Sequence, residues 1–231
     1  MAKTRAAAPI EFPTGHTAGP VAGRLLEPPW ARLLYVLAHG AGAGMRHPFL
    51  EAVAERLGGA GVATFRYQFP YMEAAAGGRG RPDPPWVLEA TVWAAVEAAA
   101  RALPDLPIVA GGKSLGGRMT SMAAAKAPLP GVRGLVFVGF PLHPPKQPGT
   151  KRAEHLSEVP IPMLFLQGTR DALADLTLLR PVVKRLGSRA TLEVVEGADH
   201  SFKVLKRSGR TDGEVLDQLV RAIVEWAQAS L

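Results

Sequence analysis

One serine, with a glycine two residues before it and another two residues after it, constrains this chain more than any other feature. Gly112, Ser114 and Gly116 lie between an apolar, strand-like run at residues 108–111 and a helix-like run at residues 115–127. In such a G-x-S-x-G pattern a tight turn between strand and helix lifts the serine above the sheet, and larger residues at the glycines would collide with neighbouring backbone. The turn also places the serine at a helix N-terminus, which favours a developing negative charge. The pattern predicts a catalytic nucleophile, the structural alternative being a serine N-cap.

An acid and a base follow downstream, each just past the end of another strand-like run. Asp171 comes after residues 161–167, and His200 comes after residues 191–196. The order serine, aspartate, histidine differs from that of chymotrypsin-type and subtilisin-type proteases, and it accompanies serines carried on a strand–turn–helix elbow. We therefore predict that His200 acts as the general base for Ser114 and that Asp171 orients the imidazole.

Two other aspartates lie close enough in sequence to compete for the orienting role. Asp175 lies one turn further into the helix that we predict over residues 172–186, and it is the weaker candidate. Asp199 is adjacent to His200, and neighbouring side chains usually diverge. Asp171 could also cap the predicted helix, a role compatible with orienting the histidine.

A glycine-rich turn after another strand-like run predicts where a reaction intermediate's negative charge is bound. The apolar run at residues 33–38 reads as a buried strand and ends in His39, followed by alternating glycine and alanine up to Gly44. Backbone N–H groups of such a turn can face the same space as the serine and bind the oxyanion of a tetrahedral intermediate. We predict that the N–H of Leu115 and that of Ala41 form the oxyanion hole, with Gly42 and Ala43 as alternatives to Ala41. His39 is expected to brace the turn by hydrogen bonding.

Two irregular stretches, residues 68–85 and 141–160, follow strands and are rich in proline and glycine. Loops at the carboxyl ends of parallel strands line the ligand crevice of such sheets. Substrate contacts are therefore expected from His143, Phe69 and Tyr71, although the two aromatic rings could equally pack their own loop. The second stretch is only about twenty residues long, so we expect no separate cap domain.

Other polar residues near these motifs receive structural interpretations. Lys113 and Arg118 flank the serine, and we expect surface or ion-pair roles for both. His16 and His155 are expected on the surface, and His47 is expected to begin a helix before Pro48.

The chain resembles the α/β-hydrolases over nearly its whole length, and more narrowly a dienelactone-hydrolase-like branch. This branch includes uncharacterised bacterial proteins together with proteins of the testis-expressed and chromatin-acetyltransferase-subunit types. The narrower resemblance rests on residues 39–45, 47–49, 65–71, 112–118 and 139–145. It implies the fold and the triad of Ser114, Asp171 and His200 rather than a particular substrate.

Strand-like and helix-like runs alternate along the chain after an antiparallel opening hairpin at residues 11–26. This alternation predicts an α/β-hydrolase fold with a mostly parallel sheet flanked by helices on both faces. The 231 residues suit a single domain, expected over residues 10–231 after a flexible N-terminus at residues 1–9. No apolar run reaches the length of a membrane span, and no signal peptide is apparent, so a soluble cytoplasmic protein is the default expectation.

Several function classes are disfavoured by the composition. The net charge is +7, but the basic residues are scattered and no common nucleic-acid motif appears, so we expect neither a nucleic-acid partner nor a membrane partner. The chain has no cysteine, and no histidine–carboxylate spacing suits zinc, so we predict no metal and no cofactor. Phosphate-loop and dinucleotide patterns fail because Pro107, Met45 and His47 stand where glycines are needed.

The resulting expectation is a serine hydrolase that cleaves a small carboxylic ester or related acyl substrate through an acyl-enzyme. Two alternatives stay open. One is a hydrolase of a thioester, lactone or peptide bond. The other is a non-catalytic interaction scaffold that keeps the fold, because fold does not determine function.

Overall fold

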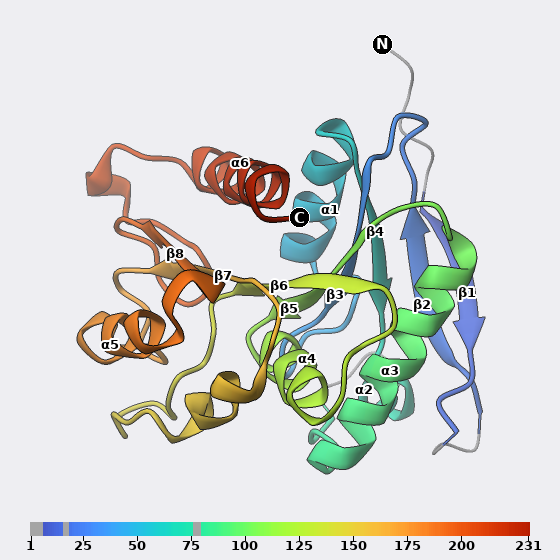
Figure 1. Cartoon of the computed structure of the whole chain (residues 1–231). Coiled ribbons are helices and arrows are strands. Elements are labelled where there is room, and N and C mark those ends of the chain that lie inside the picture. Colours follow the sequence, from blue (N-terminus) through green and yellow to red (C-terminus); the bar gives the residue numbers. More distant parts are fainter. Residues whose placement is uncertain (1–6, 16–18, 76–79) are drawn as a thin grey trace.

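The computed structural model describes residues 7–15, 19–75 and 80–231 (Figure 1). Within these residues, one eight-stranded sheet has the order β1-β2-β4-β3-β5-β6-β7-β8. The expectations for residues 1–6 and for His16 lie outside the described residues. In chain order the strands are Ala8–Phe12, Val21–Leu26, Leu33–Ala38, Val62–Tyr67, Ile108–Lys113, Val132–Val138, Met163–Gly168 and Ala190–Val195.

The sheet is antiparallel at one edge and parallel elsewhere. Strand β1 pairs antiparallel with β2, as the opening hairpin predicts, and β2 pairs antiparallel with β4. From β4 to β8 every pairing is parallel. The carboxyl ends of β3, β5, β7 and β8 therefore meet at one edge, which brings together residues far apart in the sequence.

Helices cover both faces of the sheet, which confirms the predicted fold class. Helices α1 (Pro48–Gly59) and α6 (Asp212–Ser230) contact each other and share one hydrophobic cluster. Helices α3 (Pro85–Ala102), α4 (Leu115–Lys126) and α5 (Leu176–Leu186) contribute to the cluster on the opposite face. Every residue of β3 is buried, as expected of a strand covered on both sides. Each large apolar side chain in these clusters contributes about 1.5–3 kcal/mol through burial.

Three local predictions need correction. The stretches at residues 68–85 and 141–160 are not wholly irregular, since they contain α2 (Pro70–Ala74) and the 3-10 helix η1 (Lys151–Glu158). Helix η1 buries Ala153 and Leu156 and packs on α4. Helix α5 begins at Leu176 rather than at residue 172.

Candidate active site

Ser114 lies in a strained turn between β5 and α4. Its φ of 52° and ψ of −114° are unusual for a residue with a side chain. A Cβ on Gly112 would lie 2.3 Å from the Ala38 oxygen, and one on Gly116 would lie 2.6 Å from the His39 oxygen. These distances confirm that both glycines are required by the close approach of β3.

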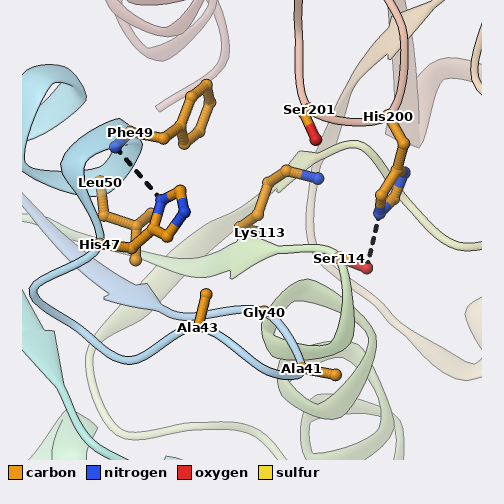
Figure 2. Close-up of a pocket in the computed structure, with 10 residues that line it drawn as sticks. All are labelled: Gly40, Ala41, Ala43, His47, Phe49, Leu50, Lys113, Ser114, His200 and Ser201. Carbon is orange, nitrogen blue, oxygen red and sulfur yellow. Dashed lines mark hydrogen bonds between the residues drawn. The ribbon is translucent and has the colours of Figure 1, made fainter. Parts of the chain in front are cut away.

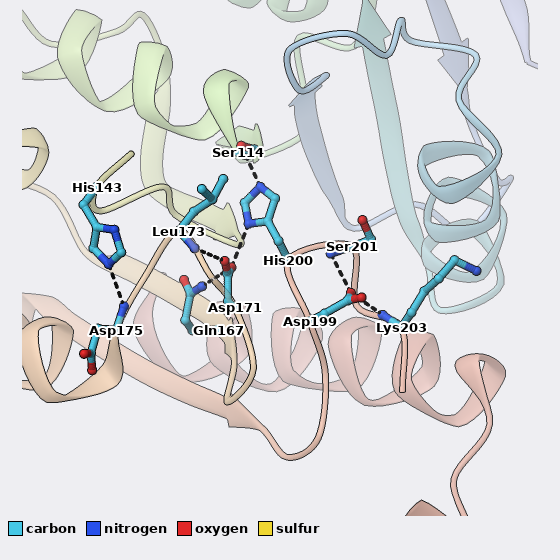
Figure 3. A network of polar contacts seen from close by, with 10 residues as sticks. All are labelled: Ser114, His143, Gln167, Asp171, Leu173, Asp175, Asp199, His200, Ser201 and Lys203. Atoms are coloured by element: carbon cyan, nitrogen blue, oxygen red, sulfur yellow. Dashed lines mark hydrogen bonds and ion pairs between the residues drawn. The ribbon is translucent and has the colours of Figure 1, made fainter. Parts of the chain in front are cut away.

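A continuous chain of hydrogen bonds joins Ser114, His200 and Asp171 (Figure 3). His200 Nε2 lies 2.9 Å from Ser114 Oγ, and His200 Nδ1 lies 2.7 Å from Asp171 Oδ2. Because an ionised carboxylate only accepts hydrogen bonds, the Nδ1–H donates to Asp171 and Nε2 is left to accept the serine proton. The three residues thus have the geometry of a nucleophile, a general base and an orienting acid.

The Asp171 side chain is fully buried and fixed from two further directions. The Leu173 N–H donates to Oδ1 at 2.8 Å, and the amide of buried Gln167 donates to Oδ2. Since both donors belong to β7 or to the loop that follows it, the carboxylate is held by the same segment that carries it. Sequence reasoning missed Gln167. Its position four residues before Asp171, at the end of the same strand, was the signal that could have pointed to it.

The two competing aspartates have other partners. Asp175 caps α5, since its Oδ1 accepts from Thr177 N at 2.8 Å. Asp199 accepts from the backbone N–H groups of Ser201 at 2.8 Å and Lys203 at 2.9 Å, and so shapes the loop that carries His200. Neither carboxylate orients the imidazole.

The glycine-rich turn after β3 lies beside the serine and is braced by His39. This buried ring bonds the Gly40 oxygen through Nδ1 at 2.8 Å, and its Nε2 accepts from Phe69 N at 3.0 Å. Burial lowers the pKa of His39 to about 4, so the ring is neutral at neutral pH and can accept and donate together. The structure confirms the bracing role predicted for His39.

Two backbone N–H groups near the serine belong to the predicted oxyanion hole. Leu115 is the first residue of α4, so its N–H has no acceptor within the helix. Ala41 lines the same cavity as Ser114, whereas the Ala43 N–H donates to the Gly40 oxygen at 3.4 Å and Gly42 is not among the cavity-lining residues. This placement favours Ala41 over the two alternatives.

A cavity of about 160 Å³ opens at Ser114 (Figure 2). Its walls come from the glycine-rich turn, the start of α1, the elbow and the His200 loop, with the residues Gly40, Ala41, Ala43, His47, Phe49, Leu50, Lys113, Ser114, His200 and Ser201. His47 begins α1 as predicted, its Nδ1 accepting from Phe49 N at 3.3 Å. Sequence reasoning missed the wall formed by Phe49 and Leu50, whose apolar side chains are typical of any amphipathic helix.

The three residues proposed for substrate contact lie away from this cavity. Phe69 is fully buried, with its ring stacked on that of Tyr71 at 6.3 Å and edge-on to His39. His143 is buried behind the acid loop, where its Nε2 accepts from Asp175 N at 3.1 Å. These side chains support the turn and the acid loop instead of forming the cavity wall.

The structural interpretations of three other residues need correction. Lys113 is neither exposed nor ion-paired, because its Nζ is buried without a hydrogen-bond partner in the described part of the chain. Arg118 is half-buried, and its Nε likewise has no such partner there. His155 is not a free surface residue, since its Nε2 lies 2.8 Å from Ser121 Oγ inside the α4–η1 contact.

Among residues 7–15, 19–75 and 80–231, no group of three or more histidine, aspartate and glutamate side chains could hold a metal ion. None of the helices in these residues combines the length and the apolarity needed to cross a membrane.

Comparisons with known proteins agree with this architecture. The chain is similar to a dienelactone hydrolase from Anabaena variabilis (21% identity, 98% of both chains covered, TM-score 0.76). It is also similar to a lidless α/β serine hydrolase from Xanthomonas campestris (18% identity, 95% of this chain and 94% of that one, TM-score 0.70). A third similar structure is an α/β serine hydrolase homologue from Coxiella burnetii (20% identity, 96% and 98% covered, TM-score 0.70).

At these identities the structures show a shared fold, whereas a family match concerns the sequence itself. Residues 31–228 match the family described as alpha/beta hydrolase domain. The matched segment runs from the start of β3 into α6 and includes the serine, the aspartate and the histidine. The chain therefore belongs to the α/β hydrolase domain family.

Proposed function

We propose that the protein is a serine hydrolase that cleaves small carboxylic esters or related acyl substrates, with Ser114, His200 and Asp171 as its catalytic triad. The observation that carries this proposal is the unbroken hydrogen-bond chain from Ser114 Oγ through the imidazole to the buried carboxylate. The small cavity at the serine and the lidless relative support an open site for a small substrate.

The reaction follows from the direction of these hydrogen bonds. Ser114 Oγ attacks the acyl carbon while its proton passes to His200 Nε2, and Asp171 stabilises the imidazolium that forms. The N–H groups of Leu115 and Ala41 bind the oxyanion, a contribution of several kcal/mol at comparable sites. The imidazolium then protonates the leaving alcohol, and an acyl-Ser114 ester remains. Water attacks this ester, losing a proton to His200, and the acid and the free serine are released.

The size of the cavity and its apolar wall indicate which acyl groups fit best. About 160 Å³, with Phe49 and Leu50 on one side, fits a short apolar acyl group better than a long one. The same chemistry would cleave a thioester or a lactone, and a peptide bond would additionally need protonation of an amine. We keep the small ester as the proposal and treat these bonds as alternatives.

The interaction-scaffold alternative rests on the resemblance to the chromatin-acetyltransferase-subunit type. An aligned triad that opens onto a cavity argues against it, because a scaffold has no need to keep a strained Ser114. A cytoplasmic site of action stays a prediction.

Burst kinetics with p-nitrophenyl acetate and longer acyl esters would test the proposal. We expect one equivalent of p-nitrophenol per active site in the burst, followed by steady turnover that falls as the acyl chain lengthens. His200→Ala, which leaves the serine in place, should abolish both phases. Turnover that His200→Ala does not change would contradict the proposal, and a stoichiometrically co-purifying protein without any turnover would favour the scaffold.

A further inference from the structure

Lys113, which precedes the serine, carries a buried charge that none of the steps above uses. Its Nζ has no hydrogen-bond partner among the described residues and is shielded from solvent. Leaving an ammonium group unpaired in a protein interior costs several kcal/mol, so such groups are retained where they serve a function. Arg118 differs, since it belongs to α4 rather than to the strand that carries Lys113 and its side chain is only half-buried.

An aromatic face holds the ammonium in place. Nζ lies 5.6 Å from the centroid of the Phe202 ring, a cation–π distance. Phe202 has a φ of 60°, an unusual value for a bulky residue, and its ring stacks on Phe49 at 5.9 Å. The backbone two residues after His200 is thus strained in a way that places a ring against Lys113. Figure 2 shows the Lys113 side chain extending from the elbow toward the loop of His200 and Ser201.

The ammonium also lies close to the acid of the triad, with Gly139 between them. A Cβ on Gly139 would lie 3.1 Å from Lys113 Nζ and 3.6 Å from Asp171 Oδ2. This oxygen is the one that receives the His200 Nδ1–H. A residue with a side chain at position 139 would separate the two charges, and the φ of +71° there also favours glycine.

The charge state of Lys113 depends on these surroundings. Burial lowers the pKa of Lys113 to about 8, while the Asp171 and Asp199 carboxylates act in the opposite direction. Two further titratable residues line the same cavity as Lys113, namely His200, on the same loop as Asp199, and His47 at the start of α1. Lys113 is therefore a cation at pH 7 and becomes neutral in mildly alkaline solution.

Building on the proposed function, we propose that Lys113 is a positioning residue of the triad, whose ammonium balances the Asp171 charge across Gly139 and so limits how firmly His200 holds a proton. Without this cation the uncompensated carboxylate would bind an imidazolium more strongly, and His200 would be protonated at higher pH. With it, the imidazole stays neutral and able to accept the Ser114 proton at lower pH. The same cation weakens the imidazolium that forms during attack, so the rate should increase further as Lys113 deprotonates.

Lys113→Met, with a side chain of similar length and no charge, tests this inference, and Lys203→Met is the matched control. Lys203 is an exposed lysine in the loop that carries His200, and its Nζ lies 3.2 Å from Asp212 Oδ2. In Lys113→Met the acid limb of the kcat/KM profile should move to higher pH by about half a unit or more. The rise in rate that we expect of the wild type between pH 7 and 9 should be absent in Lys113→Met, and Lys203→Met should keep the wild-type profile.

Titration of the His200 ring by NMR, assigned with His200→Ala, gives a readout that needs no turnover. The midpoint should be higher in Lys113→Met than in wild type and Lys203→Met, whichever acyl bond the protein cleaves. Unchanged or lower midpoints would overturn the role of Lys113, whereas a shifted midpoint without hydrolysis would count against the proposed function alone.

Thermal stability separates this role from a purely structural one. Because the folded state holds the Lys113 proton less tightly than the unfolded chain, the charge destabilises the fold at neutral pH, and this penalty declines as pH rises above 8. Lys113→Met should therefore melt a few degrees higher than wild type at pH 7. A lower melting temperature with an unshifted profile would show a structural residue. Lys113→Gln serves if the methionine variant fails to fold, and failure of both to fold would likewise overturn the inference.

Discussion

In the described part of the chain, two serine–histidine hydrogen bonds of nearly equal length involve α4, one at its N-cap and one within the helix. Ser114 Oγ lies 2.9 Å from His200 Nε2 at the start of α4, and Ser121 Oγ lies 2.8 Å from His155 Nε2 two turns further along. Distance alone does not distinguish the pairs. Their surroundings do.

The two hydrogen bonds run in opposite directions. Ser121 has a single hydroxyl hydrogen, which it donates to the Arg118 oxygen at 2.8 Å, so His155 Nε2 must donate to Ser121. At the elbow Asp171 accepts the Nδ1–H of His200, so the serine donates to the imidazole. Only the second arrangement lets the histidine take a proton from the serine. The carboxylate fixes which imidazole nitrogen carries the hydrogen, and this determines whether the histidine can act as a base.

The environments also differ in charge and access. Burial and, to a smaller extent, the nearby Arg118 cation together lower the pKa of His155 to about 4. No carboxylate contacts the His155 ring in the described part of the chain, and Ser121 is fully buried in regular helix. Ser114, in contrast, lies in a strained turn and opens onto a cavity. The Ser121–His155 pair has the properties of a packing contact between α4 and η1.

Removing the serine hydroxyl from each pair should give the largest difference in activity between them. Ser114→Ala should lower kcat/KM for small esters by about 10⁴-fold or more, because it removes the nucleophile. Ser121→Ala should leave kcat/KM within about twofold and cost about 1 kcal/mol of stability through the lost hydrogen bond. Initial rates and urea unfolding of both variants provide the measurement. Comparable rate losses would contradict the assignment.

The orienting acid should have the next largest effect. Asp171→Asn places an amide where the imidazole N–H donates and favours the wrong tautomer, so kcat should fall by about 10³–10⁴-fold with little change in KM. Asp175→Asn keeps a capping oxygen on α5 and should retain wild-type kinetics. Steady-state rates of the two aspartate variants provide the measurement. If Asp175→Asn were slower than Asp171→Asn, the assignment would be wrong.

The elbow glycine should show a smaller effect, on stability. In Gly116→Ala the new methyl would lie 2.6 Å from the Ala38 Cβ and from the His39 oxygen, and such overpacking costs about 1–3 kcal/mol. Gly59→Ala is the control, because nothing lies within 4 Å of its Cβ position. Chemical denaturation should show the first variant destabilised and the second unchanged or more stable. Equal stabilities would mean that the backbone approach at the elbow is looser than described.

Acidification should destabilise the folded protein through two histidines, His39 and His155. Because His39 and His155 both have pKa values lowered to about 4, the unfolded chain binds their protons first as pH falls below about 6.5. Stability should therefore decline between pH 6.5 and pH 4, and less steeply in His155→Gln, whose amide can still donate to Ser121. Melting temperatures across this range provide the test, and identical slopes in both proteins would contradict it.

The triad residues were predictable from sequence because each follows an apolar strand directly. Parallel strands bring their carboxyl ends to one edge, so Ser114, Asp171 and His200 could be placed together without knowing any loop. The bracing role of His39 followed in the same way from its position at the end of β3. These predictions used the glycines around Ser114, the strand-like runs and the order of the residues along the chain.

The cavity wall and the second pair were not predictable in this way. Phe69 and Tyr71 follow a strand too, but α2 turns them into the core, while Phe49 reaches the cavity from α1. His155 meets Ser121 only because η1 folds back on α4. Such contacts depend on how loops close and on tertiary packing, which leave no periodic signal in the chain.

Labelling with a fluorophosphonate tests the central claim most directly, namely that Ser114, of the two histidine-bonded serines compared above, is the activated nucleophile. Attack by Ser114 Oγ forms a P–O bond and expels fluoride, which adds a defined mass to the intact protein. We predict a single adduct, mapped to Ser114, that is absent in Ser114→Ala and His200→Ala and retained in Ser121→Ala and His155→Gln. An adduct on Ser121, or none on well-folded wild-type protein, would contradict the account.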